Sequence, residues 1–173
     1  TPTGGFTVVR SDFIELGNIV GDERTGDLYV SDRGANRIYR LGTNGVPIAI
    51  AGNGYLTNSI GGGDGGPALL TGLIAPRCVA FLPNNGFFTC EHSPGNRIWY
   101  IDPVGIAHLW VRGNDSNNKR VGDGEWFYKD LENLNTNKVS RVRSVIPDPM
   151  GNLIVTESNY GYVRRIRFQR MNP

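Results

Sequence analysis

A short segment occurs three times along this chain of 173 residues, and this repeat constrains the fold more than any other feature. The copies are GDLYVSDRGANRIYRL at 26–41, NGFFTCEHSPGNRIWYI at 85–101 and GNLIVTESNYGYVRRI at 151–166. In every copy a turn glycine lies 12 residues before a β-branched residue, and an acidic residue follows that glycine by five or six positions. A repeat of this length indicates a chain built from similar supersecondary units.

Short apolar runs flank the copies. Runs at 14–20, 77–82 and 142–146 precede the three copies, and runs at 46–50 and 106–111 follow the first two. They are rich in β-branched and aromatic residues, and turns with Asn-Gly or Pro separate them, which is typical of consecutive antiparallel hairpins. The sequence therefore predicts an all-β chain whose units are four-stranded meanders.

Composition agrees with this interpretation. The chain has 24 Gly and 10 Pro, which disfavours long helices, and a hydrophobic fraction of 39%, which disfavours a disordered chain. No stretch reaches the roughly 18 consecutive apolar residues of a membrane helix, so we expect no membrane insertion. A signal peptide is not recognisable either, and the segment looks excised from a longer protein, so the sequence leaves the compartment undetermined.

The repeats resemble those of the NHL-repeat family of β-propellers. In that family the repeat runs roughly G-N-L-Y-V-A-D, then a short loop and N-x-R-I, and the copy at 26–38 is the most similar to it. The long-period variety of the family also has a G-D-G-G-P-A loop followed by L-x-x-P, matched here at 63–68 and 73–76. The resemblance covers about residues 11–168 and implies a β-propeller built from four-stranded antiparallel blades.

Three blades are predicted in this chain. Blade 1 is expected at about 11–52, blade 2 at about 73–113 and blade 3 at about 138–170, where the outer strand is missing. Residues 5–10 resemble the outer strands of the other blades, so we expect an N-terminal strand to complete a last blade. Propellers usually have four to eight blades. Two chains could each lend this strand to the other and form a six-bladed homodimer; a longer propeller or an open half ring remains the alternative.

One face of such a propeller carries the loops between the second and third strands and the loops between blades. Ligands are expected there, because a rigid scaffold presents its variable loops on that face. The candidate binding residues on these loops are Arg33, His92, Trp126, Phe127, Tyr128, Tyr160 and Tyr162.

Other residues of the repeat are expected to be structural. Asp32 with Arg37, and Glu91 with Arg97, are predicted to pair a carboxylate with a guanidinium across a tight loop. Glu157 occupies the same position in the third copy, but Tyr162 replaces the arginine there. The remaining structural candidate is Asp64, which is expected to fix a tight turn in the glycine-rich loop.

No catalytic constellation, metal site or cofactor motif is visible. The two histidines, His92 and His108, fall on a loop and on an outer strand, so one chain cannot form a three-histidine zinc site from them. Cys78 and Cys90 lie on two arms of one hairpin, a geometry that suits a disulfide poorly, so two buried free thiols are expected. The chain is therefore predicted to be no enzyme.

The leading hypothesis is a binding or scaffold module that recognises a protein or peptide through its loop-rich face. RNA binding is the alternative, because residues 138–173 contain seven basic and two acidic residues, a net charge of +5, and the loops carry aromatic residues. Against RNA stands the net charge of −3 in the rest of the chain. A lactonase or lyase, as found among related propellers, is the third hypothesis.

Overall fold

The structure is a computed structural model of the chain and describes residues 4–5, 8–111, 139, 141–158 and 161–167. These residues form eleven strands and one short 3-10 helix. The elements are β1 Leu16–Gly21, β2 Leu28–Asp32, β3 Arg37–Leu41, β4 Pro47–Ala51, η1 Ala68–Leu70, β5 Ala80–Phe81, β6 Phe87–Cys90, β7 Ile98–Ile101, β8 Ala107–Val111, β9 Val142–Pro147, β10 Leu153–Glu157 and β11 Tyr162–Ile166. Within the described part, no helix has the length and apolar character that crossing a membrane requires.

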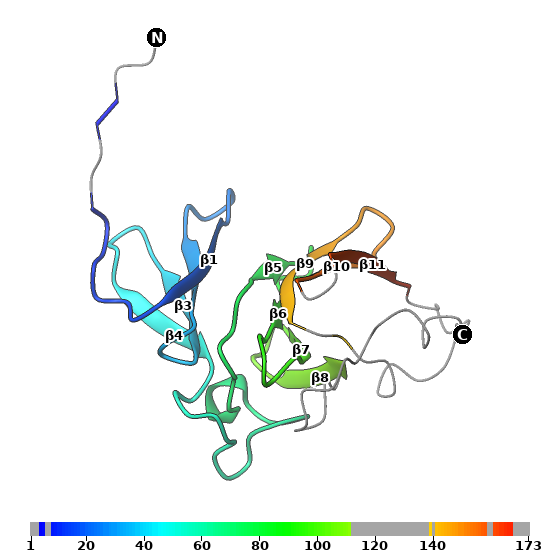
Figure 1. The fold of residues 1–173 in the computed structure, drawn as a ribbon. Coiled ribbons are helices and arrows are strands. Elements are labelled where there is room, and N and C mark those ends of the chain that lie inside the picture. The colour runs from blue at the N-terminus through cyan, green and yellow to red at the C-terminus, as the bar shows by residue number, and fades with distance from the viewer. Residues whose placement is uncertain (1–3, 6–7, 112–138, 140, 159–160, 168–173) are drawn as a thin grey trace.

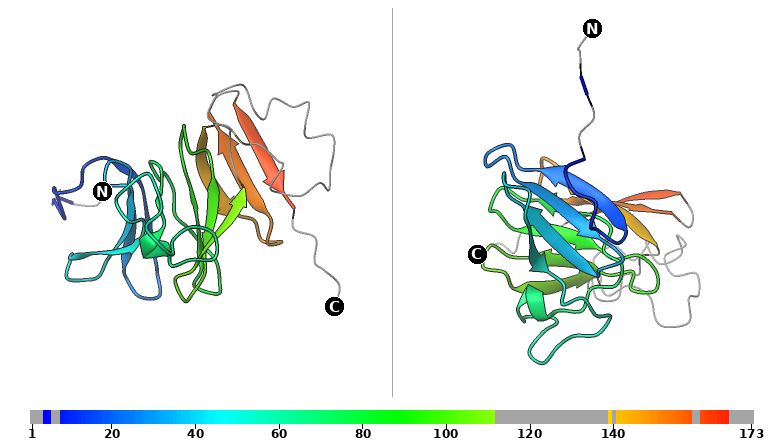
Figure 2. Two further views of the ribbon diagram at one scale, coloured as in Figure 1. Left: turned by 90° about the horizontal axis from the view of Figure 1, so that it is seen from below. Right: turned by 90° about the vertical axis from the view of Figure 1, so that its left-hand side faces the viewer.

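The strands form three antiparallel sheets that follow the chain order. The sheet of blade 1 has the order β1-β2-β3-β4, that of blade 2 β5-β6-β7-β8, and that of blade 3 β9-β10-β11. The sheets radiate from their innermost strands β1, β5 and β9, as the sectors of a wheel do (Figure 1), and pack with their faces side by side (Figure 2). The predicted all-β class and the four-stranded meanders of blades 1 and 2 are confirmed.

Two faces of the molecule follow from this meander. The tight-turn face carries the short turns at 22–26, 43–45, 83–86, 102–105 and 148–151. The loop-rich face carries the connections at 33–36, 52–75 and 92–96, together with the residues that lead into β1 and β9.

The turns of the tight-turn face share one device. An Asp or Asn side chain in each turn accepts a hydrogen bond from a backbone N–H two residues later, at 2.9–3.0 Å. Such Asx turns favour tight chain reversal. The accepting residues are Asp22, Asn44, Asn84, Asp102 and Asp148.

Blade 3 ends in β11, which has only one neighbour, β10, among the described strands. The predicted N-terminal strand does not complete this sheet within the same chain. Residues 8–10, the N-terminal arm, form no strand and lie on the blade 1 side of the molecule, away from blade 3 (Figure 1). Val8 and Val9 on this arm are exposed.

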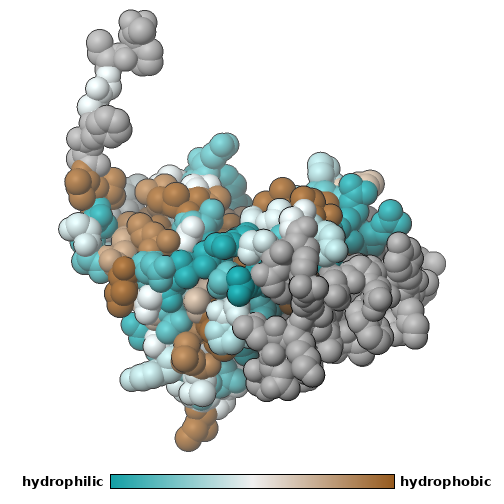
Figure 3. All heavy atoms as spheres, viewed as in Figure 1, coloured by the Kyte–Doolittle hydropathy of each residue, from teal (hydrophilic) through white to brown (hydrophobic). Residues whose placement is uncertain are grey.

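Hydrophobic surface is visible over blade 1 and again near blade 3 (Figure 3).

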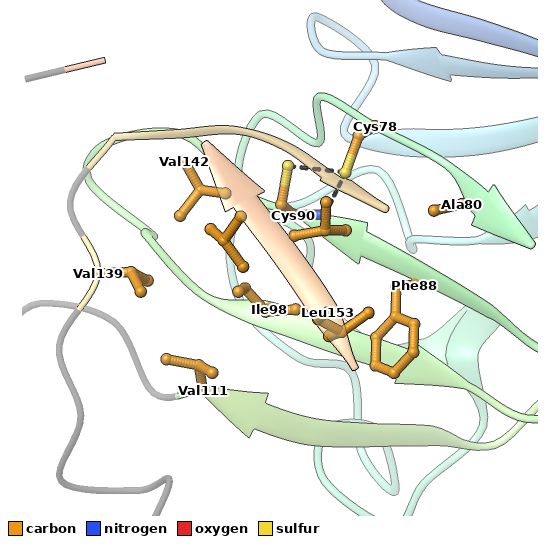
Figure 4. Packing of buried hydrophobic residues seen from close by; sticks show 11 residues of the cluster. Cys78, Ala80, Phe88, Cys90, Ile98, Val111, Val139, Val142 and Leu153 are labelled. Atoms are coloured by element: carbon orange, nitrogen blue, oxygen red, sulfur yellow. Dashed lines mark hydrogen bonds between the residues drawn. The ribbon is translucent and has the colours of Figure 1, made fainter. Parts of the chain in front are cut away.

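Two apolar clusters hold the blades together. One lies between blades 1 and 2 and includes Ile38, Leu73 and Trp99. The other joins blades 2 and 3, with Phe88 and Leu153 packed near each other (Figure 4). Because each blade buries a sheet face against the next, the two clusters join the three blades and support the loops.

Candidate functional site

The acidic residue at the end of β6 anchors the loop-rich face of blade 2. Glu91 is fully buried, and its Oε1 accepts hydrogen bonds from the backbone N–H of Ile74 at 3.0 Å, Arg97 Nη2 at 2.7 Å and Trp99 Nε1 at 3.0 Å. Arg97 also lies over the Trp99 ring, 5.0 Å from its centroid. The predicted pairing of Glu91 with Arg97 is present, and it ties the loop before β5 to the hairpin of β6 and β7.

The equivalent pair in blade 1 is not formed as predicted. Asp32 accepts hydrogen bonds from the backbone N–H groups of Ile14 and Glu15, both at 2.9 Å, and from two amides of its own loop. Arg37 instead donates to the backbone oxygen of Asn53 at 3.1 Å. The shorter Asp side chain is satisfied by backbone amides, so Arg37 is left to hold the loop that follows β4.

Blade 3 restores the pair with a different arginine. Glu157 forms an ion pair with Arg164 Nε at 2.7 Å, and both side chains are almost fully buried. Arg164 is two residues beyond Tyr162, the residue that replaces the repeat's arginine. The Tyr162 ring lies against the Arg164 guanidinium, 4.8 Å from its centroid. Tyr162, predicted to bind a ligand, therefore lies against a structural ion pair.

The glycine-rich loop is structural, but its aspartate does not fix its own turn. Asp64 Oδ1 accepts a hydrogen bond from the backbone N–H of Leu109 in β8 at 2.9 Å. Gly65, Gly66 and Ala68 exchange further backbone bonds with residues 105–107, each at 2.8 Å. Asp64 thus fastens a loop of blade 1 along the outer strand of blade 2.

Two of the predicted binding residues belong to one group of basic side chains, the inner basic cluster. It consists of Arg33, Arg77, His92, Arg141 and Arg143, which come from all three blades. The first four lie at the loop-rich ends of the blades, and Arg143 lies in β9. These positions surround the loop-rich end of the innermost strands.

Backbone contacts hold the members of the inner basic cluster in place. Arg33 donates its N–H to the Glu15 oxygen at 2.7 Å, and Arg77 donates to the Cys90 oxygen at 2.8 Å. The backbone N–H of Arg141 donates to Asn96 Oδ1 at 2.7 Å. A Cβ added to Gly17 would lie 3.1 Å from the Arg77 Cα, so this glycine lets β1 approach blade 2 closely.

The side chains of this cluster carry buried nitrogens without a hydrogen-bond partner among the described residues. Arg33 Nε, Arg77 Nε and His92 Nε2 are buried and make no hydrogen bond to any described residue. Buried polar groups are normally hydrogen-bonded, so three such nitrogens in one cluster require an explanation. Arg33 is not wholly unpaired, because its Nη1 binds Glu15 Oε1.

The charges of the inner basic cluster repel one another. Burial, and after it Arg77, Arg143, Arg33 and Arg141, lower the pKa of His92 to about 4, so its imidazole is neutral at pH 7. Burial and the neighbouring arginines also lower the pKa of Arg77. A region of unbalanced positive charge with unused donors favours an anion.

A pocket lies beside the cluster on blade 1. It has a volume of about 420 Å³, and loop residues of blade 1 line it together with the segment that leads into β1. Phe13, Tyr39 and Tyr55 give it an aromatic lining, and Arg37 and Asp32 add polar groups. Phe13 packs on Tyr39 with 5.7 Å between ring centroids.

The other sequence predictions have separate outcomes. Trp126, Phe127, Tyr128 and Tyr160 lie outside the described residues. Cys78 and Cys90 are free thiols that lie side by side in the core, as predicted (Figure 4).

His108 lies on β8, as predicted. Its Nε2 is 3.1 Å from Asp102 Oδ2, on the tight-turn face and away from His92. Over the described part of the chain no group of three or more His, Cys, Asp or Glu side chains is placed to hold a metal ion.

Sequence reasoning missed Arg77, Arg141 and Arg143 as members of the cluster. They were visible only as part of a basic C-terminal third or as one residue of an apolar run. A usable signal was nevertheless present, because each precedes or begins the innermost strand of a blade. In a propeller the loop-rich ends of innermost strands converge, which would have brought them together with Arg33 and His92.

Comparison with known proteins supports the fold alone. No family model and no curated protein matches the chain. A structural genomics protein of unknown function from Bacteroides thetaiotaomicron matches with a TM-score of 0.63 and 13% identity over 85% of this chain and 33% of that chain. Virginiamycin B lyase from Staphylococcus aureus matches with a TM-score of 0.51 and 13% identity over 90% of this chain and 42% of that chain.

This chain spans about a third of the first of these structures and less than half of the second. Its three radiating antiparallel sheets correspond to a part of a β-propeller. The chain is all-β, and its fold is that of a partial β-propeller.

Proposed function

We propose that this chain is a non-enzymatic, NHL-type β-propeller module that binds a protein or peptide through its loop-rich face. The inner basic cluster carries this proposal. Three of its members hold buried nitrogens with no hydrogen-bond partner in the described residues, on the face where a rigid scaffold presents its loops. A partner that supplied acceptors there would satisfy these donors.

The pocket on blade 1 supports a peptide as the ligand. Its aromatic residues Phe13, Tyr39 and Tyr55 offer apolar contact, and Tyr55 is exposed. Aromatic side chains beside charged ones are typical of surfaces that anchor peptides. An extended segment seated in this pocket would pass close to Arg33 of the inner basic cluster, because Asp32 and Gly34, its two neighbours in the chain, line the pocket.

The enzyme hypothesis has less support. Virginiamycin B lyase shares the fold with this chain at 13% identity, which does not transfer its activity. His92 and His108 lie on opposite faces, and His92 is surrounded by arginines rather than by carboxylates. A histidine that acts as a general base is usually held in position by a neighbouring carboxylate. His92 has arginines beside it instead, so it is better suited to contact a ligand.

RNA binding remains the second candidate, because the inner basic cluster would also attract phosphates. RNA binding should weaken steeply between low and physiological salt. Affinity for an oligouridylate that stays flat over this range would contradict it.

Selection of displayed peptides tests the proposed function. A library of random peptides is selected against the immobilised chain, and the enriched peptides are assayed against Tyr55→Ala and Arg143→Gln on the loop-rich face. Arg24→Gln on the tight-turn face is the matched control. The proposal predicts enriched peptides that lose affinity for the loop-face variants alone. Failure to enrich any peptide, or equal losses with the control, would contradict it.

We also propose that two copies of this chain close a six-bladed ring. Blade 3 offers the edge of β11, and the exposed arm with Val8 and Val9 can add a strand to that edge in a second copy. Both end blades also present exposed apolar side chains, among them Ile19 on β1 and Val163 on β11. Covering these surfaces favours association.

Light scattering across concentrations tests the ring. A particle near twice the 19.0 kDa of the chain supports it. A monomer at all concentrations contradicts closure by a second copy and favours a ring whose other blades belong to a longer chain. Deleting residues 1–10 should convert a dimer to monomers if the arm supplies the missing strand.

A further inference from the structure

The unpartnered donors of the inner basic cluster point toward a specific ligand chemistry. Arg33 Nε, Arg77 Nε and His92 Nε2 come from two blades, and each is buried without a hydrogen-bond partner among the described residues. A buried donor left without a partner is costly, because it has lost its hydrogen bond to water. Three in one cluster are consistent with a site that is completed by acceptors from a ligand.

The charge of the site is equally one-sided. The charges of four arginines act on a histidine that is neutral at pH 7, and Glu15 is the acidic residue that pairs with one of them. Glu15 is half exposed and engages only Nη1 of Arg33. The cluster therefore keeps a positive excess that a ligand with one or two negative charges would balance.

We propose that the inner basic cluster binds the carboxylate of an acidic side chain presented by a peptide segment of a partner protein. This inference rests on the proposed function, because it assigns a ligand chemistry to the same loop-rich face. Arg33 Nε and Arg77 Nε donate to the carboxylate oxygens, and the neutral His92 ring adds a third N–H in the tautomer that carries its proton on Nε2. Arg141 and Arg143 provide the surrounding positive charge.

The contact between Arg33 and Glu15 shows that a carboxylate fits this environment. An arginine binds a carboxylate most strongly through two parallel N–H groups. Arg33 uses Nη1 for Glu15 and leaves Nε without a partner, so Nε is the donor that a second carboxylate would fill. The ion pair with Glu15 thus orients the Arg33 guanidinium and leaves its Nε donor unused.

Burial of the donors favours a side-chain carboxylate over a nucleic acid backbone. The three nitrogens lie below the surface, and an Asp or Glu side chain on its narrow, flexible stem is better suited to reach such depth than a polymer backbone. A phosphodiester carries a sugar on both sides, and proteins usually contact it with exposed Lys and Arg along a groove.

Fluorescence anisotropy with a labelled, capped oligoglutamate peptide tests the proposal at low and physiological salt. The matched probe is the corresponding oligoglutamine peptide. We expect the oligoglutamate peptide to bind and the oligoglutamine peptide not to bind. Arg33→Gln should lower the affinity for oligoglutamate by about tenfold, because it removes a charge-assisted hydrogen bond. Arg24→Gln, on the tight-turn face, should leave the affinity unchanged.

A second variant separates a specific contact from general attraction. Arg33→Lys keeps the charge but removes the Nε donor, so it should weaken binding nearly as much as Arg33→Gln. Full affinity in Arg33→Lys would overturn the assigned contact. Circular dichroism and thermal unfolding confirm that each variant folds, and Arg143→Gln, at an exposed position, provides a variant whose folding is not at risk.

The remaining arms identify the source of the anion. Free glutarate that competes as well as the peptide would show a small-molecule carboxylate site and overturn the peptide assignment. An oligouridylate that binds in an Arg33-dependent way while oligoglutamate does not would overturn it in favour of RNA. Selected peptides that bind the loop-rich face independently of Arg33 would overturn this inference and leave the proposed function standing.

Discussion

The two faces of this molecule treat their polar groups in opposite ways. On the tight-turn face, each described hairpin turn contains an Asp or Asn whose side chain accepts a backbone N–H of the same turn. On the loop-rich face, three side-chain nitrogens of the inner basic cluster are buried without an acceptor among the described residues. The turns of one face satisfy these side-chain oxygens locally, whereas the cluster on the other face keeps nitrogens without a partner.

The difference shows where the chain keeps binding potential and where it does not. In a turn of this kind the Asp or Asn oxygen is already used for a local hydrogen bond. The loop-rich face instead has two sets of polar side chains. Buried carboxylates with hydrogen-bond partners, such as Glu91, form what we call the lower layer. Basic residues with a nitrogen that has no partner among the described residues, such as Arg77, form the upper layer. Stability is expected to depend on the lower layer and binding on the upper one.

The largest effect should come from the lower layer. Glu91→Ala removes a fully buried carboxylate that accepts from Ile74, Arg97 and Trp99, and leaves the arginine without its counter-charge. We expect a loss of about 3–5 kcal/mol in the free energy of unfolding, measured by urea denaturation.

Arg33→Gln, in the upper layer, is the matched comparison. Its contact with a half-exposed Glu15 should contribute less than about 1 kcal/mol. Equal destabilisation by Glu91→Ala and Arg33→Gln would remove the distinction between the two layers.

A smaller effect is expected on the tight-turn face. Asn84 Oδ1 accepts the N–H of Gly86 at 3.0 Å, and its Nδ2 donates to the Tyr100 hydroxyl at 2.9 Å. Asn84→Ala should lower the free energy of unfolding by about 1 kcal/mol, the usual contribution of such bonds. Its affinity for the oligoglutamate peptide should equal that of the unaltered chain; a weaker affinity would contradict the assignment of binding to the opposite face.

The pH dependence of stability should separate the faces. His92 titrates near 6.5 when unfolded and near 4 when folded, so between these values the unfolded chain binds the extra proton. Stability should therefore fall modestly as the pH drops from 6.5 toward 4, since His92 is partly exposed. The pKa values of Asp22, Asp102 and Asp148 are lowered, chiefly by hydrogen bonds to Arg24, Ile106 and Asn152 respectively. Their stabilisation is present above their ordinary pKa of 3.8 and is lost below it.

His92→Gln tests this separation. It should remove the decline between pH 6.5 and 4 and keep the decline at lower pH. Urea denaturation across this range provides the measurement, and an unchanged upper decline would show that another group titrates there.

Sequence reasoning could predict the blades because their determinants are local. The spacing of turn glycines and β-branched residues marked the hairpins, and the structure has strands in each predicted unit. The sequence also predicted that Arg33 and His92 lie on the loop-rich face. What it could not supply were contacts between blades, which depend on register and side-chain length.

Two residues illustrate this limit. Asp32 was expected to bind Arg37, but its shorter side chain reaches the amides of Ile14 and Glu15 instead. Arg77 belonged to an apolar run in the sequence, and only the packing of β1 against blade 2 shows that it joins Arg33 and His92.

Nuclear magnetic resonance of the arginine Nε–H groups tests the central claim most directly. Resonances of Arg33 and Arg77, assigned with Arg→Lys variants, are followed during titration with the oligoglutamate peptide, with Arg24 as the reference on the tight-turn face. If the loop-rich face binds through its unused donors, the Arg33 and Arg77 signals shift in a saturable way and that of Arg24 does not. Binding that leaves the Arg33 and Arg77 signals in place, or that shifts Arg24 equally, would contradict the account.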